Sequence, residues 1–158
     1  MENFIVDTGD IFIGHLGGYK QDCIGYISFD ISDLSRIECV FDSPFGLLIP
    51  TFEKYEPRDA FNELYISGVD YGATPLYSGV KDLPDIIGVL SLPATSDYVD
   101  HNSEGIMFLL ATAIQEGRDR VQFRMKYSDY SSYSDSSETH GIRINRMNVG
   151  LNVTYYER

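Results

Sequence analysis

The chain has 158 residues, of which 43% are hydrophobic and 23% charged, a composition typical of a soluble globular protein. Its 24 acidic residues against 12 Lys and Arg give a net charge of −12. Nucleic acids and anionic lipids bind proteins through Lys and Arg, so this charge argues against both as partners. The longest apolar run, Ile106–Ala111, is too short for a membrane-inserted helix, which needs about 20 residues. We expect a single domain over residues 1–158.

The β-strands predicted from alternating apolar and polar residues are, in chain order, Ile11–Ile13, Cys23–Ile31, Ile37–Phe41, Phe45–Phe52, Glu63–Gly72, Ile86–Leu92, Arg120–Tyr127, Gly141–Met147 and Leu151–Tyr156. The alternation breaks at Ser43-Pro44, and the Gly- and Pro-rich segment 72–84 is predicted to be a loop. Helical spacing of apolar residues predicts one helix over residues 103–116, with Gly117 as its terminating glycine. Many short strands with one helix predict an all-β fold, an antiparallel β-sandwich.

The start of the chain and its two cysteines bear on its compartment. Met1–Phe4 has neither a basic region nor an apolar stretch, so no export signal is visible, and the chain is either cytoplasmic or a domain of a longer exported protein. If the strands around Cys23 and Cys39 pair through the turn between them, Cys39 lies opposite Phe29. The two cysteines are then about 20 Å apart, too far for a disulfide. We therefore expect two buried thiols.

Segments at both ends of the chain carry a resemblance to a known family. Gly9–Gly14 is followed by Gly25–Ser32, which ends in Phe-Asp-Ile-Ser. Later, a helix ending at Gly117 precedes the strand Arg120–Met125, and Leu151–Tyr155 closes the chain. In order and spacing these segments resemble the DNRLRE-type jelly-roll domains of bacterial and archaeal proteins, over about half of the chain.

This resemblance implies a jelly-roll sandwich of a secreted or cell-surface protein, without catalytic residues. We therefore expect a non-catalytic extracellular carbohydrate-binding or adhesion module, whose partner is a polysaccharide or another cell-surface polymer. The loop Ser128–His140 lacks the Asp-Asn-Asp-Gly string common in the family, which weakens the case for an inherited metal site there. Two alternatives stay open: a self-associating structural subunit of a cell-surface layer or filament, and a polysaccharide-degrading enzyme.

Three tyrosines are candidate ligand-binding residues because they are expected at the surface. Tyr19 follows a Gly-Gly turn, and Tyr130 and Tyr133 lie in a loop too polar to belong to the core. Sugar binding requires aromatic faces beside polar side chains, so exposed tyrosines fit the expected function.

Three cations complete the candidate ligand-binding set. Arg124, Lys126 and Arg143 would share one outward face if the strands Arg120–Tyr127 and Gly141–Met147 are neighbours. Guanidinium groups bind carboxylates and sulfates bidentately, so such a stripe would suit an acidic polysaccharide. The alternative is that these cations pair with nearby acids across a solvated sheet face.

Calcium is the candidate cofactor, with Asp7 and Asp10 as its ligands. Both carboxylates flank the glycine of an Asp-Thr-Gly-Asp turn, and Ca²⁺ takes its oxygen ligands from such turns. The alternative is a solvated acidic turn.

No catalytic motif is present. The chain has neither an H-E-x-x-H nor a Gly-x-Ser-x-Gly sequence. His15, His101 and His140 are expected far apart in turns or loops, so we predict no zinc site.

Overall fold

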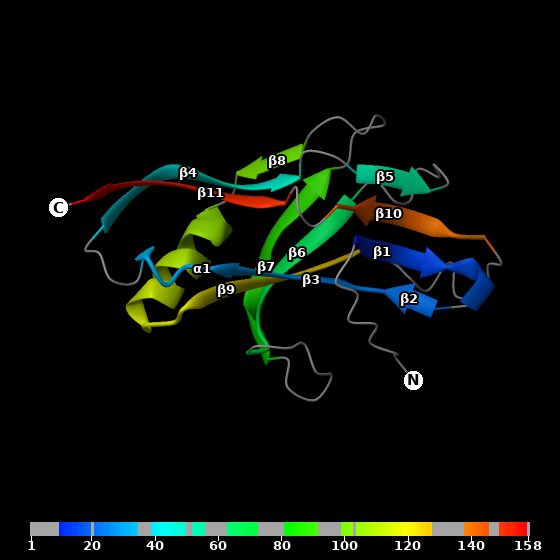
Figure 1. Ribbon diagram of the computed structural model, residues 1–158, viewed down its shortest axis with the longest axis horizontal. Helices are drawn as coiled ribbons and strands as arrows, with labels where there is room; N and C mark the ends of the chain where they lie inside the picture. Colours follow the sequence, from blue (N-terminus) through cyan, green and yellow to red (C-terminus); the bar gives the residue numbers. More distant parts are fainter. Residues whose placement is uncertain are drawn as a thin grey trace.

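The computed structural model describes residues 10–19, 21–34, 39–49, 52–55, 63–72, 81–91, 99–102, 104–127, 138–145 and 149–157. Within these ranges the chain is mostly β, with three antiparallel sheets and one α-helix (Figure 1). The predicted all-β class is therefore confirmed.

The first sheet joins segments from both ends of the chain. In spatial order its strands are β2 (Gln21–Cys23), β1 (Ile11–Leu16), β10 (His140–Ile144) and β5 (Phe52–Tyr55). A short 3-10 turn, Gly17–Tyr19, leads from β1 toward β2. Ile13 lies opposite Ile142, and both side chains are fully buried, so this sheet turns one face toward the core.

The second sheet turns one face toward the core and the other away from it. Its strands are, in order, β3 (Gly25–Asp30), β9 (Arg120–Tyr127), β6 (Glu63–Asp70) and β7 (Lys81–Ser91). Along β9, Val121, Phe123, Met125 and Tyr127 are buried and alternate with more polar residues, because successive side chains of a strand point to opposite faces. The sequence prediction for this strand is confirmed.

The third sheet consists of β11 (Gly150–Glu157), β4 (Cys39–Ile49) and β8 (Val99–Asn102) in that order. It lies on the other side of the helix from β3 and β9 in Figure 1. The third sheet is thus separated from the polar face of the second sheet.

The helix α1 (Glu104–Gln115) contacts β4, β7 and β9 and so fills the space between two sheets. Its buried residues are Ile106, Leu109, Leu110 and Ala113. Beyond its end, the N–H of Arg118 donates to the carbonyl of Ala113 (2.8 Å) and the N–H of Gly117 donates to that of Ile114 (3.0 Å). With φ of +68° at Gly117, this is the Schellman termination that the sequence predicts. No helix in the described part of the chain is long and apolar enough to cross a membrane.

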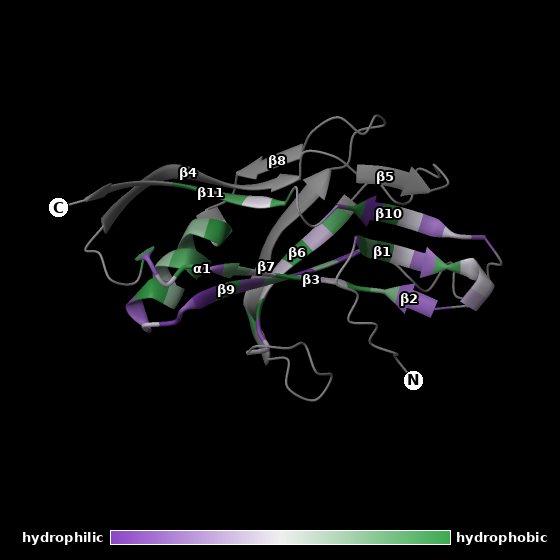
Figure 2. Cartoon of the chain, in the orientation of Figure 1, coloured by the Kyte–Doolittle hydropathy of each residue, from purple (hydrophilic) through white to green (hydrophobic). Residues whose placement is uncertain are grey.

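The core lies where the first and second sheets meet α1. Its buried members are Ile13, Ile27, Ile31, Leu64, Ile66, Ile106, Leu109, Leu110, Ala113, Val121, Phe123, Met125, Tyr127, Ile142 and Ile144. Figure 2 shows the corresponding green positions on α1 and along the alternating strands β1 and β10. Phe29 meets Phe123 edge to face, with ring centroids 6.0 Å apart, a favourable aromatic geometry.

The expected pairing of the strands around Cys23 and Cys39 is wrong. β3 pairs with β9, which puts Phe29 opposite Val121, whereas Cys39 lies opposite Glu157 in another sheet. Cys23 is a half-buried residue of β2, and the side chain of Cys39 lies outside the described residues.

Two prolines lie inside strands, at positions where the sequence predicts breaks. β4 runs continuously through Pro44, and β7 already begins at Lys81 and runs through Pro84. Each proline sits where the register shifts: between Asp42 and Gly46 of β4, and between Asp82 and Ile86 of β7. A β-bulge leaves residues outside the ladder, so proline's missing N–H costs no ladder hydrogen bond there.

Candidate functional site

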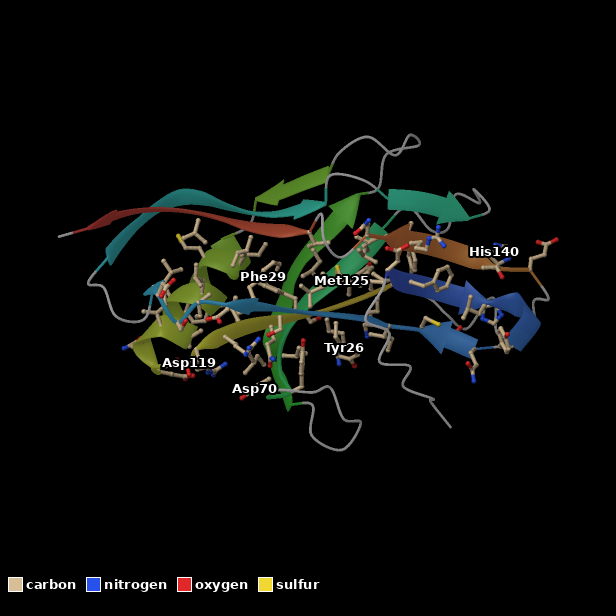
Figure 3. The ribbon with its side chains drawn as sticks, viewed as in Figure 1. Tyr26, Phe29, Asp70, Asp119, Met125 and His140 are labelled. Carbon is tan, nitrogen blue, oxygen red and sulfur yellow. The ribbon has the colours of Figure 1, made fainter. Side chains whose placement is uncertain are left out.

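The face of the second sheet that points away from the core carries a polar row along β9. This β9 row consists of Arg120, Gln122, Arg124 and Lys126. Directly opposite residues of antiparallel strands share a face, which places Tyr26 of β3 beside Arg124 and Tyr65 of β6 beside Lys126. Figure 3 shows Tyr26 on the opposite side of β3 and β9 from the core residues Phe29 and Met125. The row is therefore flanked by tyrosines on both neighbouring strands.

Gln122 holds the end of β6 against this row. Its Oε1 accepts a hydrogen bond from the backbone N–H of Tyr71 (2.8 Å), and its Nε2 donates to the carbonyl of Gly72 (2.7 Å) and to Ser28 Oγ (3.3 Å). The residue is only 4% exposed, so these bonds replace the water its amide would otherwise bind. Gln122 thereby fixes the backbone that follows β6.

Two tyrosines meet beside Gln122. The rings of Tyr26 and Tyr71 are edge to face, with centroids 5.7 Å apart and an interplanar angle of 83°. Burial raises the pKa of the Tyr71 hydroxyl, which keeps it a neutral hydrogen-bonding group. Arg120 Nη1 donates to Ser28 Oγ (3.3 Å), so Ser28 links the tyrosine side of the face to the arginine.

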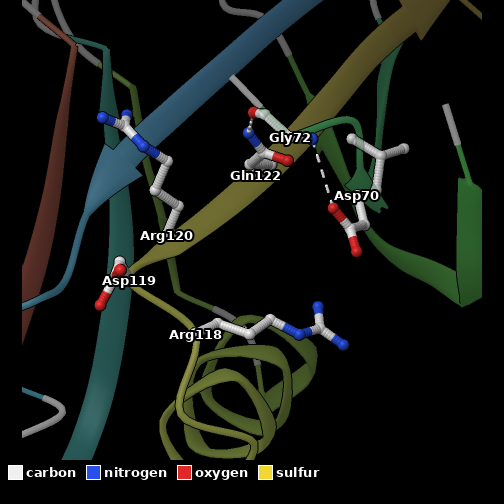
Figure 4. Close-up of a pocket in the computed structure, with 7 residues that line it drawn as sticks. Asp70, Gly72, Arg118, Asp119, Arg120 and Gln122 are labelled. Atoms are coloured by element: carbon white, nitrogen blue, oxygen red, sulfur yellow. Dashed lines mark hydrogen bonds between the residues drawn. The ribbon is translucent and has the colours of Figure 1, made fainter. Parts of the chain in front are cut away.

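A cavity of about 270 Å³ opens at the Arg120 end of the β9 row (Figure 4). Its lining comes from the end of β6, from the turn after α1 and from the start of β9: Val69, Asp70, Gly72, Arg118, Asp119, Arg120 and Gln122. The N–H of Gly72 donates to Asp70 Oδ1 (3.3 Å), and φ of +65° at Gly72 turns the chain there. The carbonyl of Asp119 accepts from the N–H of Ile31 (2.9 Å), which ties the turn after α1 to the end of β3.

Charges of both signs surround this cavity. Arg118 forms an ion pair with Glu116, and Arg120 lies near Asp30 at the opposite register position. The backbone N–H of Ser32 donates to Asp30 Oδ1 (2.9 Å); this bond, a side-chain hydrogen bond with Ser32 and the charge of Arg120 lower the pKa of Asp30. Two arginines and two aspartates are among the residues that line the cavity, so hydrogen-bond donors and acceptors occur together there.

The structure brings together only part of the predicted cationic stripe. Arg124 and Lys126 lie on the same face of β9, both half-buried. Arg143 would share this face only if the strands that carry Arg124 and Arg143 were neighbours. They are not, because β9 and β10 belong to different sheets. Arg143 is exposed and its Nε lies 3.4 Å from Asp10 Oδ2. It therefore behaves as the alternative interpretation expects, as a cation paired with a nearby acid.

Of the three tyrosines predicted to bind ligand, one lies within the described residues. Tyr19 is 77% exposed in the turn after β1, a strand of the first sheet, whereas the β9 row belongs to the second sheet. Tyr130 and Tyr133 lie outside the described residues, and their role stays a prediction.

Only one of the two predicted calcium ligands lies within the described residues. Asp7 lies outside the described residues, and Asp10 pairs with Arg143. Within the described ranges, no group of three or more His, Cys, Asp or Glu residues is arranged to hold a metal ion. The calcium site stays a prediction.

Two of the histidines are not in loops, as the sequence suggested, but face each other across paired strands. His15 of β1 lies opposite His140 of β10, and each is only 1% exposed. His15 Nδ1 lies 2.8 Å from Asp22 Oδ1, and His140 Nε2 lies 3.8 Å from Glu138 Oε2. The third histidine also lies in a strand, β8.

No protein-family model matches the chain, no curated protein matches it, and no solved structure matches it. The resemblance to DNRLRE-type domains therefore rests on the sequence segments alone.

Proposed function

We propose that this chain is a non-catalytic carbohydrate-binding or adhesion module of an extracellular or cell-surface protein, with a jelly-roll sandwich as its fold. Its partner would be a polysaccharide or another cell-surface polymer. The observation that carries the proposal is the β9 row, in which Arg124 and Lys126 lie between Tyr26 and Tyr65 on a face that points away from the core.

Sugars present apolar C–H faces and a rim of hydroxyl groups. A tyrosine ring combines an apolar face with a polar tip and so matches both parts. Arginine contributes a planar set of donors, which bind carboxylates or sulfates in pairs and hydroxyls singly. Tyrosines on both sides of a cationic strand therefore form an elongated surface suited to a polymer lying along β9.

The net charge of the protein bears on whether an acidic polymer can bind along β9. With a net charge of −12, most of the surface repels an acidic polymer, but salt screens such repulsion beyond about 8 Å. A local cationic row can thus bind an acidic segment while the rest of the molecule stays unbound.

Affinity electrophoresis through gels containing neutral or acidic polysaccharides tests the proposal, with calcium and with chelator. The double variant Arg124→Ala/Lys126→Ala should lose retardation in the gel that retards the wild type. Arg143→Ala is the matched control, because it also removes a cation but lies in a different sheet, and it should stay retarded. Equal losses in both variants would contradict a binding face on β9, and unchanged mobility in every gel would contradict the proposal.

The open edge of β11 favours a second candidate function, a self-associating structural subunit. In the described part of the chain this strand has β4 on one side only, and its sequence GLNVTYYE contains neither Lys nor Pro to block further pairing. Sedimentation velocity over a range of concentrations would detect such assembly. A sedimentation coefficient independent of concentration would contradict it.

A further inference from the structure

We propose that the cavity lined by Arg118, Asp70 and Gln122 is a subsite for one neutral, hydroxylated sugar ring. The inference rests on the proposed function and deepens it, because it assigns a ligand class to the end of the β9 row. The subsite would bind a sugar that carries neither a carboxylate nor an amino group, unlike the acidic segments suited to Arg124 and Lys126.

The size of the cavity limits how large a ligand it can hold. Its volume of about 270 Å³ is just below the range of roughly 300–1,000 Å³ found for small-molecule pockets. A single ring fits this space, whereas a run of several sugars does not. The cavity thus suits a terminal or branching residue of a polymer that follows the β9 row.

The charges of the lining set the second limit. A carboxylate in the cavity would meet Asp70, and an amine would meet Arg118, so each ionic ligand is repelled by a side chain of its own charge. A hydroxyl group both donates and accepts, and so can donate to a carboxylate and accept from a guanidinium in the same cavity. Neutral polyols are the ligand class for which no lining charge is repulsive.

The positions of the charged groups favour one pair as the principal contacts. In Figure 4, Arg118 extends toward the side of the cavity occupied by Asp70, whereas the Asp119 carboxylate points away from both. Arg118 comes from the turn after α1 and Asp70 from the end of β6, so they face the ligand from two different elements. Such a pair can bind two neighbouring hydroxyls of one ring, with Arg118 donating a hydrogen bond to one hydroxyl and Asp70 accepting one from the other.

The backbone around this pair is fixed before any ligand arrives. The Schellman bonds at Gly117 set the direction of Arg118, and the N–H of Gly72 holds the Asp70 carboxylate. Gln122 in turn holds Gly72 through its carbonyl (2.7 Å). A prearranged site loses less conformational entropy on binding, so even a small ring can be retained.

Backbone amide NMR titration tests the subsite directly. The probes are glucose, galactose and mannose as neutral rings, with glucuronate and glucosamine as their charged counterparts. At least one neutral ring should shift the amides of Asp70 to Gly72 and Arg118 to Gln122 with a millimolar dissociation constant, and the charged counterparts should bind at least about tenfold more weakly. If none of the neutral rings shifts these amides, or if glucuronate binds more tightly than they do, the inference is overturned.

A near-isosteric variant separates ligand contact from a structural role. Asp70→Asn keeps the shape of the side chain and removes its charge, so it should raise the affinity for glucuronate relative to the neutral ring. Asp119→Asn is the matched control, with the same change of charge on a carboxylate that points away, and should leave this ratio unchanged. An equal change in both variants would overturn the role of Asp70.

The two proposals fail in different ways. Polymer retardation that depends on Arg124 and Lys126, without any shift at the cavity, would overturn the subsite and leave the polymer-binding function standing. Shifts at the cavity together with unretarded mobility in every polysaccharide gel would support the subsite and overturn polymer binding along β9.

Discussion

Replacing Gly14 by alanine should destabilise the fold strongly, because two glycines face each other where β1 and β10 pair. Gly14 lies directly opposite Gly141, and their φ angles are +143° and +151°. A Cβ on Gly14 would lie 2.1 Å from the carbonyl oxygen of His140 and 2.6 Å from the Cα of Gly141. Both obstacles are backbone atoms, so no side chain can rotate to make room.

The expected cost follows from two contributions. Holding alanine in a φ region that only glycine readily adopts costs roughly 1–3 kcal/mol. Separating the strands around the new methyl group also weakens ladder hydrogen bonds, each worth about 1 kcal/mol. We therefore expect Gly14→Ala, and likewise Gly141→Ala, to lose about 3–5 kcal/mol. For a domain of this size each 1 kcal/mol lowers Tm by about 2–4 °C, which gives a drop of roughly 6–20 °C.

Thermal and urea unfolding of a graded series measures this effect. Gly72 has φ of +65° but nothing within 4 Å of an added Cβ, so Gly72→Ala should lose only about 1–2 kcal/mol. Gly18 has open space and no positive φ, so Gly18→Ala should be close to neutral. If Gly14→Ala is no less stable than Gly72→Ala, the close approach of β1 and β10 is not what requires glycine.

Three further predictions concern single side chains. Gln122→Ala should cost about 2–4 kcal/mol, because the backbone N–H and C=O that follow β6 lose their partners, and amide hydrogen exchange should speed up there before it does along β9. Asp30→Asn should be less stable than the wild type at neutral pH. The lowered pKa of Asp30 stabilises the folded state at pH values above the ordinary carboxyl pKa of 3.8, and this stabilisation is lost as the pH falls through the folded-state pKa. Urea unfolding should therefore show the difference between variant and wild type fading in acid, and a difference that persists there would refute the assignment. Burial and, secondarily, the Asp22 carboxylate raise the pKa of the Cys23 thiol, so iodoacetamide should modify it more slowly at neutral pH than an unstructured cysteine, and Asp22→Asn should increase the rate, as read by peptide mass mapping.

Features with local signals were predicted well from the sequence. The helix was recognised because its apolar spacing and Gly117 both lie within one short segment, and the structure places α1 within one residue of the predicted ends. The strand Arg120–Tyr127 was recognised from strict alternation, and its bounds agree fully. In both cases the physical cause of the element lies within the element itself.

Strand pairing was not predictable in the same way. Nothing near Phe29 indicates that its partner is Val121 rather than a residue of the following strand. Similarly, Pro44 and Pro84 are compatible with their strands only because each falls in a register shift, which depends on the partner strand. Pairing depends on tertiary packing, which alternation alone does not encode.

Only part of the candidate site was predicted, because the rest depends on how the strands pair. Arg124 and Lys126 were placed on one face because they share a strand, and Arg143 was misplaced because its inclusion required a pairing between strands. The cavity residues Arg118 and Asp70 were missed because they come from elements 48 residues apart in the sequence. Gly117 was a usable signal for Arg118, because a glycine that ends a helix fixes the direction in which the next residues leave it.

The pairing of β1 with β10 also determines when this fold can form during synthesis. Ile11 finds its partner only when Ile144 has been made, and β3 must likewise wait for β9 and β4 for β11. At ordinary translation rates β1 waits on the order of 10 s for its partner, with its apolar residues unprotected. A stop codon before β10 would leave the first sheet without β10 and the third sheet without β11, whereas the four strands of the second sheet would all have been made.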